Sequence, residues 1–221
     1  MVDAATQRLN MVESQVLTSD VTDHRILRAM RALPREEFVP SALAALAYMD
    51  EALPLNATGT HRRWLLAPRV QAKLLQLADI GDDDHVLDVG SATGYSAALI
   101  ASFARSVIAL ECDEQLAAAA RTTLGDGGIG NVSVVSGKLA AGWPGKAPYD
   151  AIIIEGSIDV PPEDLVDQLK DGGRLVAVVN DGGIGKATLW RRLGRSTDKR
   201  VAFDATAPEL PGFAKTPAFV L

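Results

Sequence analysis

The stretch DVGSATGYSAAL, residues 88–99, places an acidic residue and two glycines where an apolar strand passes into a helix. Gly90 and Gly94 have no side chains, so the backbone around them can approach a ligand closely. Their G-x-x-x-G spacing differs from the G-x-G-x-x-G of dinucleotide sites, and no G-K-[ST] ending follows it. The turn therefore disfavours a pyrophosphate or a nucleoside triphosphate as its ligand.

Two acidic residues end neighbouring predicted strands: Asp88 and, 23 positions later, Glu111. Open parallel sheets bind ligands beyond the carboxyl ends of their strands, and a carboxylate ending the second strand can accept both hydroxyls of a ribose. Asp88 adds a negative charge beside the turn, which favours a cationic ligand. S-adenosyl-L-methionine has a ribose, a sulfonium and an ammonium group. We predict that the two acids surround its sugar and its charged sulfur.

From residue 67 the chain alternates short apolar strands with helices, a pattern typical of parallel βαβ units. Helices are expected over 67–80, 95–104, 114–124 and 161–170, and strands over 85–90, 106–112, 132–137, 149–156 and 172–180. Segments 187–193, 199–205 and 218–221 are expected to form shorter edge strands, some of them antiparallel. Apolar periodicity predicts N-terminal helices over 4–17 and 23–33, the second capped by Asp20 or Thr22.

Several motifs are shared with one enzyme family: RLNMVESQV, ILRAMRALPREEFVP, LAYMDEALPL, HVLDVGSATGYSAAL, AGWPGKAPYDAIII and LVDQLKDGGRLVAVV. On these motifs the chain resembles protein-L-isoaspartate O-methyltransferases over nearly its whole length. The resemblance implies an α/β fold, a doubly wound, mostly parallel seven-stranded sheet of the class I SAM-dependent methyltransferase type with N-terminal helices. It implies methylation of the α-carboxyl of isoaspartyl residues in damaged proteins. The ester then cyclises to a succinimide, which can reopen as normal aspartate.

The resemblance also implies a division of the chain. We expect one methyltransferase domain over 1–221, with a helical cap and acceptor loop over 1–66, a SAM-binding core over 67–180 and edge strands over 181–221. The cofactor-binding residues that the resemblance and the glycine turn imply are Asp88, Gly90, Ser91, Ala92, Thr93, Gly94, Tyr95, Glu111, Cys112, Lys138 and Leu139.

The acceptor loop departs from the family. A threonine-isoleucine-serine-glutamine-proline run is replaced by ALPLNATGTHRRWLLAP, and no serine occurs between Ser41 and Ser91. Thr58 or Thr60 could supply a hydroxyl, and Arg62 or Arg63 could hold a carboxylate in bidentate fashion. We name Thr60 and Arg62 as the candidate catalytic pair. The alternative is that both arginines only solvate a longer loop.

Two positions in the donor site also depart from the family. Ala92 stands where the family's turn has a middle glycine, and its methyl group could crowd the methionine end of the donor. Lys138 stands where the family has an aspartate that accepts from the adenine amino group. Lysine has only donors, so it cannot accept that bond. An unpaired buried amine costs about 1–3 kcal/mol, which predicts weaker adenine binding unless another acceptor takes over.

Composition excludes several classes of protein. The 221 residues carry a net charge of −6, which argues against a nucleic-acid partner. No apolar run is long enough for a membrane span, and the N-terminus lacks a secretory pattern. A single cysteine, Cys112, fits a cytoplasmic location. His24, His61 and His85 are scattered, so no metal site is expected.

Three interpretations follow. The first is a SAM-dependent carboxyl O-methyltransferase that acts on proteins or peptides carrying isoaspartate. The second is a SAM-dependent enzyme for another acceptor, such as a small carboxylic acid or a phenol. The third is an interaction module that keeps the fold without catalysis. The N-terminal helices could cover the substrate cleft or form a homodimer.

Overall fold

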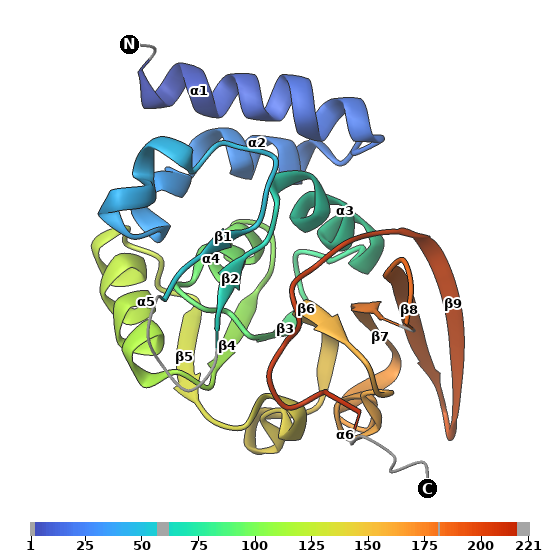
Figure 1. Cartoon of the computed structure of the whole chain (residues 1–221). Helices are drawn as coiled ribbons and strands as arrows, with labels where there is room; N and C mark the ends of the chain where they lie inside the picture. The colour runs from blue at the N-terminus through green and yellow to red at the C-terminus, as the bar shows by residue number, and fades with distance from the viewer. Residues whose placement is uncertain (1–2, 57–61, 181, 216–221) are drawn as a thin grey trace, which may run out of the picture.

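The computed structural model describes residues 3–56, 62–180 and 182–215. A seven-stranded sheet in the order β5-β4-β3-β6-β7-β8-β9 forms its centre (Figure 1). The strands are β3 (His85–Val89), β4 (Ser106–Glu111), β5 (Val132–Ser136), β6 (Tyr149–Ile158), β7 (Leu169–Val179), β8 (Lys186–Leu193) and β9 (Ser196–Asp204). The first five strands in this order are parallel, and β8 and β9 are antiparallel. The predicted mostly parallel α/β sheet is confirmed.

Both faces of the sheet are buried because successive strand residues point to opposite sides. Val86 of β3 and Val107 of β4 face one core, whereas Leu87 and Ile108 face the other. Three helices cover the first face: α3 (Pro68–Ala78), α4 (Tyr95–Ala101) and α5 (Glu114–Asp126). A short helix, α6 (Glu163–Val166), and residues 205–213 contribute to the second face. This two-sided burial explains the continuous apolar runs of the central strands.

The N-terminal residues form a helical layer that lies beside α3 at the top of Figure 1. It contains α1 (Ala4–Met11), helical turns η1 (Val12–Val16) and η2 (Leu17–Ser19), α2 (His24–Ala32), η3 (Arg35–Phe38) and η4 (Ser41–Leu46). The helix predicted over 4–17 is helical throughout, but its regular α geometry ends at Met11. None of the described helices is long and apolar enough to cross a membrane.

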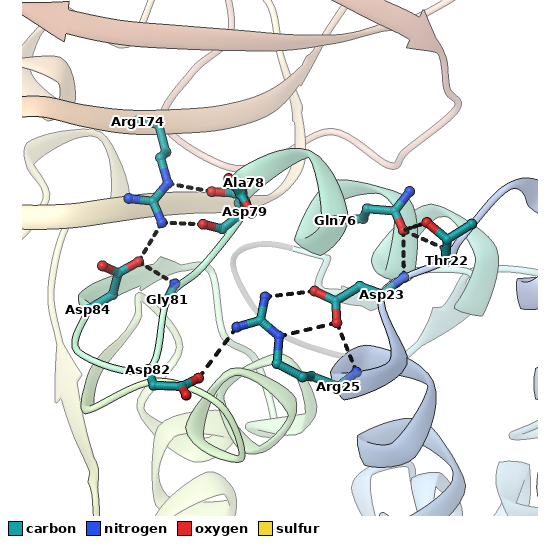
Figure 2. Close-up of polar contacts among 10 residues, drawn as sticks. All are labelled: Thr22, Asp23, Arg25, Gln76, Ala78, Asp79, Gly81, Asp82, Asp84 and Arg174. Atoms are coloured by element: carbon teal, nitrogen blue, oxygen red, sulfur yellow. Dashed lines mark hydrogen bonds and ion pairs between the residues drawn. The ribbon is translucent and has the colours of Figure 1, made fainter.

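Polar contacts hold this layer against the core (Figure 2). The side-chain oxygen of Gln76, on α3, accepts from the backbone N–H groups of Thr22 and Asp23 at 2.6 and 3.0 Å. Asp23 caps α2 by accepting from the backbone N–H of Arg25. The prediction of Asp20 or Thr22 as the cap was therefore wrong. The Arg25 guanidinium bridges Asp23 and Asp82, which joins the layer to the loop before β3.

A second contact group in Figure 2 fixes the end of α3 against the sheet. Arg174 of β7 donates to the carbonyls of Ala78 and Asp79 and pairs with Asp84. Asp79 adopts a left-handed conformation, with φ of 48°, and ends the helix. These bonds satisfy carbonyls that a helix end leaves without partners, and they fix where β3 begins.

A small hairpin stands apart from the main sheet. Its strands are β1 (Leu53–Pro54) and β2 (Trp64–Leu65), and Leu55 N–H donates to the carbonyl of Arg63 at 2.9 Å. Asn56 accepts from the Arg63 N–H at 2.8 Å and donates to the carboxylate of Asp113 at 3.2 Å. The backbone N–H and carbonyl of Arg63 are therefore both hydrogen-bonded to residues that follow β1, and these bonds hold Arg63 in place.

The C-terminal segment runs past the end of β6 towards α6 (Figure 1). Ser157 donates its N–H to Pro208 at 2.8 Å and accepts from Leu210 at 2.9 Å. The strand predicted over 218–221 lies outside the described residues. The helix predicted over 161–170 was too long: α6 ends at Val166, because Leu169 pairs with Tyr149 of β6 and so begins β7. Strand pairing overrides the helical pattern there.

Candidate active site

The glycine turn and the polar residues predicted around it meet at the carboxyl ends of the central strands. Asp88 lies in β3, Glu111 ends β4, and Lys138 and Leu139 follow β5. Gly90 and Gly94 have φ of 84° and 92°, a region that favours glycine. Parallel strands bring all of these residues to one edge of the sheet, the usual ligand-binding edge of such folds.

Ala92 adopts the left-handed conformation in the middle of this turn, with φ of 50°. A non-glycine residue in this region costs about 1–2 kcal/mol, so the turn must be held by other bonds. The Ala92 N–H donates to Glu111 at 2.8 Å, and the Thr93 hydroxyl donates to the carbonyl of Phe38 at 2.6 Å. The turn thus keeps a glycine-like shape although its middle residue is alanine.

The carboxylate of Glu111 is fully buried and fully bonded. Besides Ala92, the backbone N–H groups of Cys112 and Asp113 donate to it at 2.9 and 3.0 Å. Arg63 donates Nε to Oε1 and Nη2 to Oε2, both at 3.0 Å. Burial would raise the pKa of Glu111, but the charge and hydrogen bonds of Arg63, with the backbone donors, outweigh it and hold the pKa below its usual value.

Arg63 occupies the place expected for the sugar of the donor. Its side chain is 1% exposed, and Nη2 also donates to the carbonyl of Gly90 at 2.7 Å. A Cβ added at Gly90 would lie 2.7 Å from Leu210 and 2.8 Å from Arg63 Nη2. The space above this glycine is therefore filled by the chain itself. In this conformation the sugar and sulfur of S-adenosyl-L-methionine do not fit between Glu111 and the turn.

Next to this ion pair lies a pair of buried carboxyl groups, Asp88 and Glu155. Asp88 accepts from the Ser96 hydroxyl at 2.6 Å, and Glu155 accepts from the Gln71 amide at 3.0 Å. Burial raises the pKa of Asp88 to about 7, and burial together with the Asp88 charge raises the pKa of Glu155 as well. The two groups therefore share a proton near neutral pH, so the pair does not carry two negative charges.

A third buried group joins the site to the N-terminal layer. Arg35 donates to the carbonyls of Ala47 and Leu66 at 2.7 and 2.6 Å, and its guanidinium lies 4.9 Å from the ring centre of Tyr95. Arg35 Nη1, Ser91 Oγ and the Tyr95 hydroxyl are buried without a hydrogen-bond partner among the described residues. Buried polar atoms of this kind normally have partners. The region around the turn is therefore unusually polar for an interior.

One part of the predicted donor site is open. A pocket of about 380 Å³ lies beside Cys112, Lys138, Leu139, Pro211 and Gly212. The Lys138 side chain is exposed. Burial and the charge of Glu111 raise the pKa of the Cys112 thiol to about 11, so this thiol is not a nucleophile at neutral pH. The open pocket coincides with the residues predicted to hold the adenine.

Of the two residues named as the catalytic pair, only Arg62 lies in the described part of the chain. Thr60, like the alternative Thr58, lies outside the described residues. Arg62 is exposed, whereas its neighbour Arg63 is buried and holds the carboxylate of Glu111. That carboxylate belongs to the protein, not to a substrate. No group of three potential metal ligands occurs within residues 3–56, 62–180 and 182–215.

Sequence analysis missed four residues of this region: Arg35, Gln71, Glu155 and Leu210. An acid inside the apolar run AIIIEG was a usable signal for Glu155, because such a strand is expected to be buried on both sides. Arg35 lies in one of the motifs shared with the family. Gln71 and Leu210 carried no local signal, since each is common in a helix or a tail.

Comparisons with known proteins give a family match over most of the chain. A family profile described as protein-L-isoaspartate(D-aspartate) O-methyltransferase matches residues 7–206. Proteins named protein-L-isoaspartate O-methyltransferase from Methylorubrum extorquens and Methanoculleus marisnigri are 40% and 39% identical to the chain. The first match covers 89% of this chain and 83% of the relative, and the second covers 78% and 77%.

Two solved structures share the fold. One is a protein-L-isoaspartate O-methyltransferase with a TM-score of 0.80 and 24% identity, over 94% of this chain and 66% of that one. The other, a Plasmodium falciparum protein of this type in complex with S-adenosyl-L-homocysteine, has a TM-score of 0.75 and 18% identity. That match covers 92% of this chain and 97% of the other. The sheet is thus of the class I SAM-dependent methyltransferase type.

Proposed function

The chain belongs to the protein-L-isoaspartate(D-aspartate) O-methyltransferase family of SAM-dependent enzymes, and we propose that it methylates the α-carboxyl of isoaspartyl residues in damaged proteins. The ester formed in this way cyclises to a succinimide, so the proposed role is protein repair. The family match favours this interpretation over a different acceptor and over a non-catalytic module. The substrate assignment rests on the family match and not on the acceptor loop, because the sequence of that loop differs from the family's motif.

The observation that carries the proposal is the glycine turn between β3 and α4, with Asp88 next to the last residue of β3 and Glu111 at the end of the adjacent β4. Two carboxylates beside a glycine turn suit a methyl donor that has a ribose and a cationic sulfur. In the described conformation Arg63 fills this place, so no catalytic step can be assigned to the donor there.

The acceptor chemistry asks little of the protein beyond position. A carboxylate is ionised at neutral pH, so its methylation needs no general base. We propose that Arg62, exposed at the rim of the hairpin, orients the acceptor carboxylate together with Thr60. Holding reactants in line can supply much of a rate enhancement by itself, up to about 7–11 kcal/mol in favourable systems.

The remaining parts of the proposal concern the setting. We propose one methyltransferase domain over residues 1–221, a cytoplasmic location and no nucleic-acid partner, in keeping with the net charge of −6. The N-terminal layer is proposed to cover the substrate cleft. A homodimer through the same helices is the competing arrangement, and light scattering shows whether the protein is a monomer or a dimer.

An assay with paired peptides tests the substrate. An isoaspartyl peptide and the same peptide with normal aspartate are incubated with protein and methyl-labelled S-adenosyl-L-methionine. Base then hydrolyses any methyl ester, and the labelled methanol that is released is measured. We expect methanol from the isoaspartyl peptide alone. Equal release from both peptides, or none above the no-protein control, would refute the assignment of this substrate.

A further inference from the structure

We infer that Arg63 is an internal competitor of the methyl donor: its guanidinium occupies the donor's sugar position on Glu111, so the donor binds only after this side chain withdraws. The inference rests on the proposed function, because it concerns the same donor site. It assigns to Arg63 the control of donor affinity, a role separate from the reaction itself.

The first support is the saturation of Glu111. Three backbone N–H groups and two guanidinium nitrogens donate to its two oxygens, all at 3.3 Å or less. A carboxylate offers about four lone-pair sites, so no acceptor capacity remains for two ribose hydroxyls. The backbone donors are fixed by the turn and by the start of α5. The Arg63 side chain can leave without moving this backbone, and its withdrawal exposes the edge of the carboxylate that it now covers.

The second support is the filled volume above Gly90. In this fold a glycine at the end of the first strand lets a ligand approach the backbone. Here the space into which its Cβ would project already holds Arg63 Nη2 and Leu210. The positive φ of Gly90 would suit a ligand contact, yet the contact is made by the chain itself.

The third support is charge. Arg63 lies among three buried carboxyl groups, Asp88, Glu111 and Glu155, and its positive charge favours the ionised form of each, although only Glu111 has a lowered pKa and burial keeps the pKa of the other two raised. A guanidinium and a sulfonium are both weakly hydrated cations, and one can replace the other beside these acids. A site designed for a cationic donor is therefore also a site for an arginine of the same chain.

The fourth support is that the other half of the donor site is open. The pocket beside Cys112, Lys138 and Leu139 has a volume of about 380 Å³, whereas the sugar half is filled. The filled part of the site is the part that Arg63 Nη2 reaches together with Leu210.

The test measures binding of S-adenosyl-L-homocysteine to the full chain by calorimetry and by thermal shift. The variants are Arg63→Ala, which vacates the sugar position, and Arg63→Lys, which keeps the charge but not the two-nitrogen fork. Arg195→Ala removes an exposed arginine of the β8–β9 turn and is the matched control. Far-UV circular dichroism confirms that each variant is folded. The Lys variant keeps the experiment informative should the Ala variant fail to fold.

We expect Arg63→Ala to bind at least tenfold more tightly than wild type, Arg63→Lys to lie between them, and Arg195→Ala to match wild type. Wild-type protein that binds as tightly as the Arg63 variants would overturn the inference and leave the proposed function intact. Absence of binding by every folded variant at millimolar ligand would overturn both. Tighter binding by the variants without isoaspartyl methylation would support the inference and reject the substrate.

Discussion

The guanidinium of Arg63 lies on the carboxylate of Glu111, 48 positions further along the chain, with two N–O distances of 3.0 Å and almost complete burial of both side chains. A buried pair of this kind has a large effect when only one partner is removed, because the other is left as an uncompensated charge. The pair thus contributes to stability, and by our inference it also controls donor affinity.

The first prediction concerns stability at this pair. Arg63→Ala should lower the free energy of unfolding by about 3–5 kcal/mol, and Glu111→Gln should lower it by a similar amount. The double variant should cost less than the sum of the two, because it leaves no unpaired charge. Urea unfolding of the four proteins measures the coupling. Strict additivity would show that the two side chains do not interact in solution.

The second prediction concerns pH. Because the pKa of Asp88 is raised to about 7, the folded protein keeps a proton that the unfolded chain releases above about pH 4. Stability from this group is therefore present at low pH and is lost as pH rises through 4 to 7. Asp88→Asn should flatten the fall in unfolding free energy between pH 5 and 7.5 by about 1 kcal/mol or more.

Asp198→Asn is the control for this pH series, since Asp198 is exposed on β9. Its unfolding free energies should follow the wild-type curve at every pH. A wild-type slope that is unchanged by Asp88→Asn would mean that Asp88 does not carry the proton that the folded protein keeps.

The third prediction compares two glycines. Gly90→Ala places a methyl group at positive φ and within 2.8 Å of Leu210 and Arg63, so it should destabilise the protein by about 2 kcal/mol or more. Gly125→Ala lies in α5 with no heavy atom within 4 Å of the new Cβ, and it should stabilise the protein by about 0.5–1 kcal/mol. Thermal unfolding gives both values, and equal effects would contradict the tight contact above Gly90.

The fourth prediction concerns the open pocket. Lys138→Asp supplies an acceptor for the adenine amino group, and pairing that group is worth about 1–3 kcal/mol. S-adenosyl-L-homocysteine should bind about 10- to 100-fold more tightly to the variant in calorimetry. Lys146→Asp, with the same change of charge outside the pocket, should bind as wild type does. Unchanged affinity in Lys138→Asp would mean that residue 138 is not at the adenine.

Most of the fold could be predicted because its signals are local. Apolar runs and the alternation of strand and helix patterns predict the strands of the central sheet, and glycine spacing predicts the turn from Asp88 to Gly94. Each of these signals lies within a few residues. The end of α6 could not be predicted in this way, since it depends on Leu169 pairing with a strand that begins 20 positions earlier, at Tyr149.

The site itself was only partly predictable, for a similar reason. The sequence indicated that Arg62 or Arg63 could hold a carboxylate, but which arginine and which carboxylate depend on how the β1–β2 hairpin lies against β4. The segment around Leu210 shows no periodic apolar pattern. The place of Leu210 above Gly90 follows from pairing of the C-terminal segment with β6. Long-range contacts decide whether a site is open.

The bond from Thr93 to the carbonyl of Phe38 makes the ligand-binding turn depend on a segment that lies outside the sheet. Arg35, three residues earlier, is fixed to Ala47 and Leu66, so the same segment is held on its other side. Loosening of residues 35–38 should therefore release the Thr93 side chain. The amide protons of Gly90, Ser91 and Ala92 should stay protected from exchange with solvent deuterium, because they are bonded to Leu110 and Glu111 of β4.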